Sequence, residues 1–144
     1  MKPQKILIVE DSELLHQMYE VVFRQHRARQ GVLLHAYNGK KALDLLAQHP
    51  DVDLILLDIN MPVMSGLEFL QFCASQKVFR NIPVIVVSTE GNKDDTLRAL
   101  GSGARGYVTK PFRPQDLHAL IDRIFGVRDA GSSWSPGAAA AQGS

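Results

Sequence analysis

The sequence contains neither a long apolar run nor a marked excess of charge. The first apolar run, Ile6 to Val9, has four residues and acidic residues follow it at once, so it is too short for the core of a signal peptide. No other run is long enough to span a membrane. Because the formal net charge is +1, the chain has no overall attraction for nucleic acids or membrane surfaces. These absences exclude a membrane-embedded protein and give no support for a nucleic-acid-binding one.

Cysteine occurs once, as Cys73, so no internal disulfide can form. This agrees with a reducing compartment. Cys73 lies within an apolar helical pattern, which favours a small buried side chain over a reactive thiol. With 144 residues, of which 45% are apolar and 22% charged, the chain has the composition of one globular domain with a hydrophobic core.

Five short apolar runs, at residues 6–9, 32–36, 54–57, 84–87 and 106–108, alternate with helical patterns. Ser12 is expected to cap the first helix, a capping box at Ser65 to Glu68 to open the third, and Pro114 to lie in the first turn of the fifth. Alternating strands and helices predict an α/β fold with a parallel sheet and right-handed crossovers. We expect a doubly wound (βα)5 flavodoxin-like three-layer sandwich, with five strands in the order 2-1-3-4-5.

The apolar residues of each helical pattern predict the face that packs on the sheet. These residues are Leu14, Leu15, Met18, Val21 and Val22 in the first helix, Ala42, Leu43 and Leu46 in the second, Leu67, Leu70 and Ala74 in the third, Leu97 and Leu100 in the fourth, and Leu117, Leu120, Ile121 and Ile124 in the fifth. The second helix must end before Pro50, and Gly126 is expected to stop the fifth. Residues 127–144 are rich in Gly, Ser and Ala and lack an apolar period, so we expect one domain over residues 1–126 and a flexible tail after it.

Polar side chains lie at the expected carboxyl ends of four strands: Glu10, Asp11, Asp58, Ser88, Thr89, Thr109 and Lys110. In open α/β sheets ligands bind outside these ends. Two carboxylates about 5 Å apart at an effective dielectric of about 20 repel by about 3 kcal/mol, so three of them favour a bound cation. Mg²⁺ suits a few carboxylates, a backbone carbonyl and retained waters, and it would let an oxyanion approach Asp58. The set therefore favours phosphoryl transfer with the Asp58 carboxylate as nucleophile.

Four segments match a known pattern in order and at the expected intervals. They are residues 6–12 (ILIVEDS), residues 56–62 (LLDINMP) with Gly66, residues 83–90 (PVIVVSTE) and residues 103–112 (GARGYVTKPF). On these segments the chain resembles the receiver domain of bacterial response regulators, especially single-domain, CheY-like chemotaxis receivers. The resemblance runs from about residue 4 to residue 126 and leaves the tail outside.

The resemblance implies roles for the acidic residues. Asp58 resembles the phosphoacceptor, which takes a phosphoryl group from a histidine of a sensor kinase or phosphotransfer protein. Glu10 and Asp11 resemble the acidic pair that binds Mg²⁺, with Asp58 and the backbone carbonyl of Asn60 as the other protein ligands. Asn60 and Glu90 match variable positions that tune the lifetime of the phosphoryl group.

The resemblance also implies roles for residues at the ends of the last two strands. Ser88 matches the switch hydroxyl, and Tyr107 the aromatic side chain that swings inward when the hydroxyl moves. Lys110 matches the lysine that pairs with the acyl phosphate, and its peptide bond to Pro111 is cis in the family. Thr89 stands where the family often has a small residue, so we expect it to narrow access to the phosphoacceptor or to compete with Ser88 as a donor.

Together these features predict a bacterial cytoplasmic signalling domain that catalyses only its own phosphorylation and dephosphorylation. The expected partners are a sensor histidine kinase or phosphotransfer protein, and a downstream protein bound to the face formed by the fourth helix, fifth strand and fifth helix. We expect neither nucleic acid nor membrane as a partner of this chain, and a monomer or a weak phosphorylation-dependent dimer. The five histidines, His16, His26, His35, His49 and His118, have no paired ligand spacing and are interpreted as surface or partly buried residues.

Three alternatives remain open at this point. A phosphohydrolase with an aspartyl nucleophile, of the haloacid dehalogenase-like kind, needs a second Asp two residues after the nucleophile, where this chain has Asn60. A phosphorylation-independent interaction module commonly lacks an acidic-pair residue, the acceptor or the lysine, and this chain keeps them all. A fragment of a larger response regulator would have its output domain elsewhere, because residues 127–144 are too few for a helix-turn-helix domain.

Overall fold

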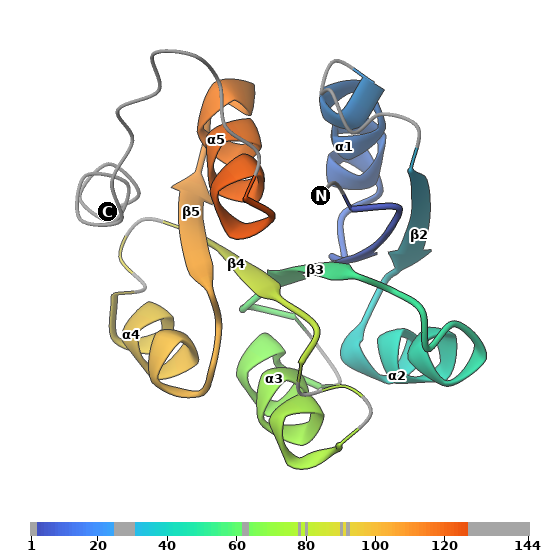
Figure 1. Cartoon of the computed structure of the whole chain (residues 1–144). Helices are drawn as coiled ribbons and strands as arrows, with labels where there is room; N and C mark the ends of the chain where they lie inside the picture. The colour runs from blue at the N-terminus through green and yellow to red at the C-terminus, as the bar shows by residue number, and fades with distance from the viewer. Residues whose placement is uncertain are drawn as a thin grey trace.

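Figure 1 shows the computed structural model of the chain, in which a parallel sheet of five strands lies between two layers of helices. The structure describes residues 3–24, 31–61, 64–77, 79, 81–89, 91 and 93–126. The elements, in order, are β1 (Lys5–Val9), α1 (Glu13–Arg24), β2 (Val32–Ala36), α2 (Gly39–Gln48), β3 (Leu54–Asp58), α3 (Gly66–Ser75), β4 (Val84–Thr89), α4 (Lys93–Gly101), β5 (Gly106–Lys110) and α5 (Pro114–Ile124). The strand order is β2-β1-β3-β4-β5 and every pairing is parallel, which confirms the predicted fold class and order.

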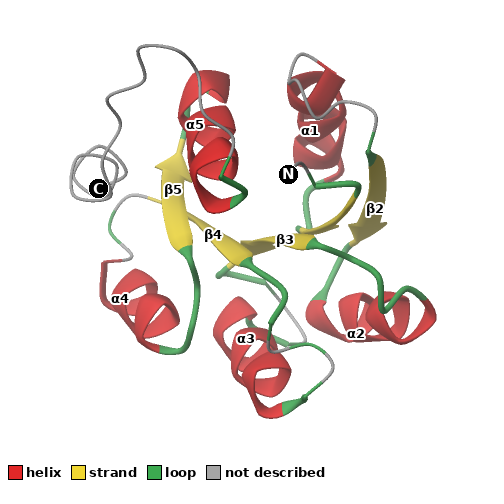
Figure 2. Ribbon diagram, in the orientation of Figure 1, coloured by secondary structure: helices red, strands yellow, loops and turns green. Residues whose placement is uncertain are grey.

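The helices cover both faces of the sheet. Helices α1 and α5 lie on one face, and α2, α3 and α4 lie on the other (Figure 2). Because side chains alternate between the two faces of a strand, each strand contributes to two separate cores. The core beside α1 and α5 includes Ile6, Ile8, Leu54, Leu56, Ile85, Val87 and Val108, and the core beside α2 and α3 includes Leu7, Val9, Ile55, Leu57, Val84 and Val86.

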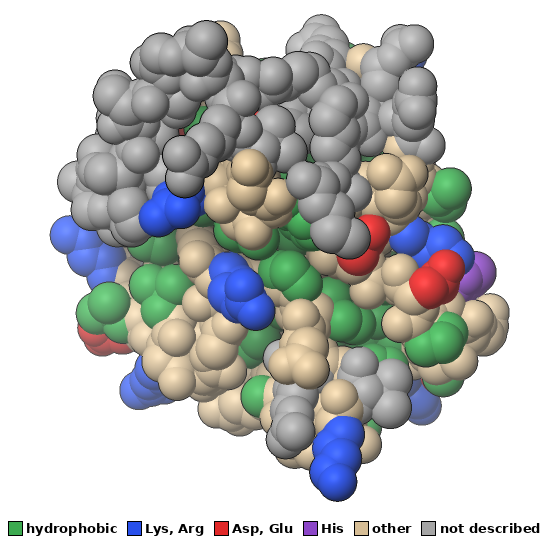
Figure 3. All heavy atoms as spheres, in the orientation of Figure 1, with side chains coloured by type: hydrophobic (Ala, Val, Ile, Leu, Met, Phe, Trp, Pro, Cys, Tyr) green, Lys and Arg blue, Asp and Glu red, His purple; other side chains and the backbone are tan. Residues whose placement is uncertain are grey.

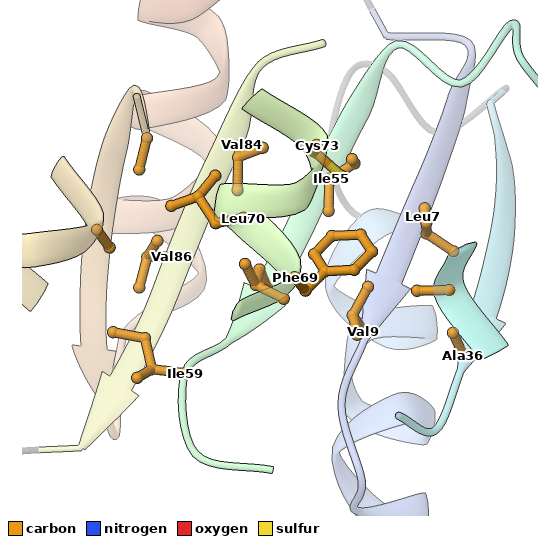
Figure 4. Packing of buried hydrophobic residues seen from close by; sticks show 14 of the residues in the cluster. Leu7, Val9, Ala36, Ile55, Ile59, Phe69, Leu70, Cys73, Val84 and Val86 are labelled. Carbon is orange, nitrogen blue, oxygen red and sulfur yellow. The ribbon is translucent and has the colours of Figure 1, made fainter. Parts of the chain in front are cut away.

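The second core shows why the central strands are almost continuously apolar. Figure 4 shows Phe69 and Leu70 of α3 packed among Val9, Ile55 and Val86 of three neighbouring strands. All five side chains are buried. A strand that is covered by helices on both faces needs apolar residues at every position, and this explains the unbroken runs in the sequence.

The predicted caps and stops are present. The Ser12 side chain accepts a hydrogen bond from the backbone N–H of Leu15 at 3.3 Å, and both hydrogen bonds of the capping box between Ser65 and Glu68 form. Pro114 is the first residue of α5, and Gly126 follows that helix with φ +73°. Local sequence signals therefore located these helix ends correctly.

The buried face of α1 differs from the prediction. Leu14 is 73% exposed and Val21 is 47% exposed, so these two were wrongly assigned to the packed face. The buried stripe instead includes His16, Tyr19 and Phe23, at the helical spacing i, i+3 and i+7. Val22 is buried and Leu15 and Met18 pack against the same core, as predicted, but a choice of aliphatic residues alone left out the three buried rings.

Helices α3 and α4 need similar corrections. Ala74 is exposed, whereas Phe69 lies in the buried face of α3. In α4, Leu97 is 66% exposed, and the buried residues are Thr96 and Ala99. A short helix with few apolar residues gives a weak pattern, so its rotation about its own axis is decided by packing.

The surface of the described residues is mixed in character. On the face shown in Figure 3, basic and acidic side chains are scattered among apolar and neutral ones. Among the described helices, none combines the length and the apolar composition that a membrane span requires. Burial raises the pKa of the Cys73 thiol to about 12, which agrees with the prediction of a packed, unreactive side chain.

Candidate functional site

Three predicted site residues lie on one side of the sheet at the carboxyl ends of their strands. Asp58 ends β3 and has the same alternation as Leu54 and Leu56, which face α1 and α5. The same alternation places Glu10, directly after β1, and Lys110, the last residue of β5, on that side. Strands β1 and β3 are neighbours, so the two acidic residues lie next to each other at the point where the chain order of the sheet reverses.

The lysine contacts both of these carboxylates. Lys110 Nζ donates a hydrogen bond to Glu10 Oε1 at 2.9 Å and lies 3.6 Å from Asp58 Oδ2. The other oxygen of Asp58, Oδ1, accepts a hydrogen bond from the backbone N–H of Asn60 at 3.2 Å. Glu10 Oε2 accepts one from the backbone N–H of Ser12 at 3.1 Å. Each buried carboxylate is thus held by one backbone donor and shares one ammonium group.

Burial changes the acidity of this cluster. Desolvation is the main cause that raises the pKa of Asp58, and it acts against the lowering effect of Lys110. Desolvation also raises the pKa of Glu10 to about 7; Lys110 lowers that pKa, and the adjacent Asp11 and Asp58 carboxyls raise it again. One lysine does not balance three acidic groups, so the cluster favours a further cation.

The acidic cluster has the donors that a hard divalent cation prefers. Glu10, Asp11 and Asp58 each offer a carboxylate oxygen, and these atoms lie within 4.8 Å of one another. Glu10 and Asp58 are buried, and Asp11 is exposed at the open side of the cluster. The turn that contains Asn60 is tied to the Asp58 carboxylate, so its backbone carbonyl belongs to the same edge. This all-oxygen donor set fits Mg²⁺.

The turn after Asp58 depends on a glycine. A Cβ atom at Gly66 would lie 2.2 Å from the backbone oxygen of Asp58 and 2.7 Å from Cα of Ile59. The Gly66 N–H donates to the Ile59 carbonyl at 2.9 Å, which ties the start of α3 to the end of β3. Only a residue without a side chain allows this approach, so Gly66 lets the turn after β3 lie close to the start of α3.

Ser88 and Tyr107 lie on the opposite side of the sheet from Asp58. Ser88 is buried, and its Oγ accepts a hydrogen bond from Thr96 Oγ1 of α4 at 3.1 Å. Tyr107 is half-buried and packs against the core beside α2 and α3. Thr89, at the end of β4, is exposed. The carboxyl edge therefore gathers the acids and the lysine on one side and the Ser88 hydroxyl on the other.

The remaining sequence predictions differ in their outcomes. The Lys110–Pro111 peptide bond is cis, as the resemblance implied. Glu90, His26 and the tail over residues 127–144 lie outside the described residues, so their predicted roles stay predictions. Thr96 was not predicted to belong to this edge, because a threonine in the first turn of a weakly patterned helix gives no sequence signal for a contact with a strand-end hydroxyl.

Two histidines form a chain of hydrogen bonds that the sequence analysis missed. His16 Nε2 lies 2.7 Å from the backbone oxygen of Glu10, and His16 Nδ1 lies 2.7 Å from His35 Nδ1. His35 Nε2 in turn lies 2.8 Å from Glu20 Oε1. Interpreting His16 as a surface or partly buried residue was wrong, because it is fully buried and paired. The pairing depends on the packing of α1 beside β2, and the spacing of residues within one segment does not show contacts between two segments.

The partners at the two ends of this chain set its protonation. A carbonyl oxygen and a carboxylate only accept, so His16 Nε2 and His35 Nε2 must both donate. The bond between the two Nδ1 atoms needs one further proton. Burial is the main cause that lowers the pKa of His16.

Comparisons with known proteins agree with this geometry. The family model described as the response regulator receiver domain matches residues 6–122. A chemotaxis protein CheY homolog of Campylobacter jejuni is 34% identical over 123 residues, which cover 85% of this chain and 93% of that protein. The solved structure of the Vibrio cholerae chemotaxis protein CheY4 is similar with a TM-score of 0.75 and 29% identity, over 85% of this chain and 98% of that chain.

A second solved structure bears on the acidic cluster. It is the receiver domain of a sensor histidine kinase from Pseudomonas aeruginosa, with a TM-score of 0.75 and 25% identity, over 86% of this chain and 98% of that chain. In that structure a magnesium ion is coordinated in the active site cleft.

Proposed function

The chain belongs to the response regulator receiver domain family of two-component signalling, and we propose that it accepts a phosphoryl group on Asp58 from a histidine of a sensor kinase or phosphotransfer protein. One observation carries this proposal. The buried Asp58 carboxylate lies 3.6 Å from the Lys110 ammonium and within 4.8 Å of the Glu10 and Asp11 carboxylates. A nucleophile, a cationic partner for an incoming oxyanion and a set of metal ligands thus occupy one edge of the sheet.

In the proposed reaction an oxygen of the Asp58 carboxylate forms a bond to phosphorus. The bond between phosphorus and the donor histidine nitrogen breaks, and the nitrogen keeps the electron pair. The Asn60 N–H orients one oxygen of Asp58, and Lys110 can move from Glu10 toward the transferred phosphoryl group. Bound Mg²⁺, held by Glu10, Asp11, Asp58 and the Asn60 carbonyl, would neutralise charge on the phosphoryl oxygens. No separate substrate is turned over, so the proposed activity is signalling rather than metabolism.

The covalent state of Asp58 would then set the state of a distant face. A phosphoryl group adds negative charge and acceptor oxygens, to which Ser88 and Lys110 respond. Tyr107 and the face formed by α4, β5 and α5 shift between two populations, and a downstream protein binds one of them. A bacterial cytoplasmic location, and a monomer or a weak dimer that forms on phosphorylation, are parts of the same proposal.

The direct test is phosphorylation by a small donor. The protein is incubated with acetyl phosphate and Mg²⁺, and its intact mass is measured. We expect the wild type and the Asp44→Asn variant, which changes an exposed carboxylate of α2, to gain one phosphoryl group. The Asp58→Asn variant should gain none. Equal labelling of that variant would show that the acceptor is wrongly assigned, and an unlabelled wild type would favour a phosphorylation-independent interaction module.

A second experiment addresses the partners. The unmodified protein and a beryllofluoride-activated form are immobilised and exposed to an extract of the source cells. We expect a downstream protein to bind the activated form selectively, because beryllofluoride mimics the phosphoryl group on Asp58. Identical sets of bound proteins would argue against a phosphorylation-dependent binding face.

A further inference from the structure

The position of Ser88 in β4 decides which helix it meets. Val84 and Val86 face α3 and the core beside it, whereas Ile85 and Val87 face α1 and α5. Ser88 follows the alternation of Val84 and Val86, so it points to the side that α4 covers. Asp58 is paired with Val87 in the sheet and lies on the other side. To reach a phosphoryl group on Asp58, the Ser88 hydroxyl must leave its present position.

A side-chain hydrogen bond from α4 holds that position. Thr96 Oγ1 donates a hydrogen bond to Ser88 Oγ at 3.1 Å, and the two residues are 7% and 2% exposed. Thr96 belongs to the buried stripe of α4, together with Ala99. A buried hydroxyl that loses its partner pays the cost of desolvation, so this bond resists rotation of Ser88 toward Asp58. It also connects the end of β4 directly to a helix of the proposed partner-binding face.

We propose that Thr96 is a positioning residue that holds the Ser88 hydroxyl against α4 and opposes its movement to the phosphoryl group on Asp58. The inference rests on the proposed phosphoacceptor role of Asp58 and adds a residue that sets the balance between the two states. When Ser88 exchanges Thr96 for a phosphoryl oxygen, the hydrogen bond between Thr96 of α4 and Ser88 of β4 is lost. By linkage, a partner that holds α4 in the released position favours phosphorylation to the same degree.

The test uses beryllofluoride with Mg²⁺ as the probe and compares variants of the full chain. Thr96→Val keeps the shape of the side chain and removes the donor, so we expect beryllofluoride to bind roughly two- to twelvefold more tightly, the range that one net hydrogen bond supports. Thr96→Ser keeps a hydroxyl and should restore affinity close to that of the wild type. Mg²⁺ affinity without beryllofluoride should be equal in all three proteins, because Thr96 is not among the proposed ligands.

The Ser88→Ala background isolates the pair. In that background the change from Thr96 to Val should no longer alter beryllofluoride affinity, since the hydroxyl that Thr96 holds is missing. A gain that persists undiminished there would overturn the proposal, as would wild-type affinity in Thr96→Val. If Thr96→Val does not fold, Thr96→Ala is measured in its place against the same predictions. A wild type that binds no beryllofluoride would overturn the proposed function as well, whereas normal wild-type binding with unresponsive Thr96 variants would overturn only the role of Thr96.

Discussion

Lys110 lies closer to Glu10 than to Asp58: its Nζ atom is 2.9 Å from Glu10 Oε1 and 3.6 Å from Asp58 Oδ2. The lysine that the phosphorylated state would use is thus held by a member of the acidic pair. Both carboxylates are buried, and this one ammonium group lowers the pKa of each. A substitution at any of the three residues should therefore change the electrostatic environment of the other two.

Removal of the lysine should make the acidic cluster harder to ionise. In Lys110→Met we expect the pKa of Glu10 to rise above its value of about 7, because a hydrogen-bond donor and a positive charge are both lost. Carboxyl carbon NMR titration without Mg²⁺ measures this shift. The control is Lys5→Met at the start of β1. It removes an ammonium group that lies 2.9 Å from Asp51, and it should leave the pKa of Glu10 unchanged. A Glu10 pKa that is unchanged in Lys110→Met would contradict the pairing.

Mg²⁺ binding should depend on pH in the range set by Glu10. Because burial raises the pKa of this carboxyl to about 7, a proton competes with the metal below that pH. We expect Mg²⁺ affinity to rise by up to about tenfold per pH unit between pH 5.5 and 7, and to level off above pH 8. Isothermal titration at several pH values tests this dependence. An affinity that stays constant from pH 5.5 to 8 would exclude Glu10 as a ligand that must lose a proton.

Without Mg²⁺, the Glu10 carboxyl should make the folded state less stable as the pH rises. Its pKa is higher in the folded chain than the ordinary value of 4.5, so the folded state binds more protons between these two values. The contribution of Glu10 to stability is therefore complete below pH 4.5 and is lost as the pH rises through about 7. Mg²⁺ should offset that loss, and the increase in unfolding temperature on adding Mg²⁺ should be larger at pH 8 than at pH 6.

Gly66→Ala should destabilise the protein. The new methyl group would lie 2.2 Å from the Asp58 carbonyl oxygen, so α3 or the turn after β3 must shift. We expect a loss of about 1–3 kcal/mol in the free energy of unfolding, measured by urea denaturation, because overpacking against backbone atoms cannot be relieved by a rotamer change. Gly101→Ala is the matched control, since a Cβ there meets nothing within 4 Å. Similar losses in the two variants would show that the close approach is not the cause.

His16 should make the fold sensitive to mild acid. Burial lowers its pKa below 6.5, so the unfolded chain takes up a proton on this ring at a higher pH than the folded chain does. Its contribution to stability is present above pH 6.5 and is lost as the pH falls below it, by at most about 1.4 kcal/mol per pH unit. His16→Gln should show a flatter dependence in urea denaturation between pH 6.5 and 5. An NMR titration in which the His16 ring protonates at or above pH 6.5 would contradict this expectation.

Most of the architecture followed from patterns that are local in the sequence. The alternation of apolar runs with helical segments, together with the caps at Ser12 and Ser65, predicted the order and the starts of the elements. The rotation of the helices was harder to predict. Leu14 and Leu97 are exposed while His16 and Thr96 are buried, because the energy of burial depends on which polar atoms find partners in the finished fold.

The amino-acid sequence by itself determined that Glu10, Asp58 and Lys110 meet at one edge, because parallel strands joined by right-handed crossovers bring their carboxyl ends together. Only the tertiary structure decided which of them pair. The 2.9 Å contact of Lys110 with Glu10, and the hydrogen bond between Thr96 and Ser88, depend on the twist of the sheet and on the packing of α4. Each of these contacts joins side chains from two different elements of the fold, so its formation is specified by the packing of the whole core and not by any one segment.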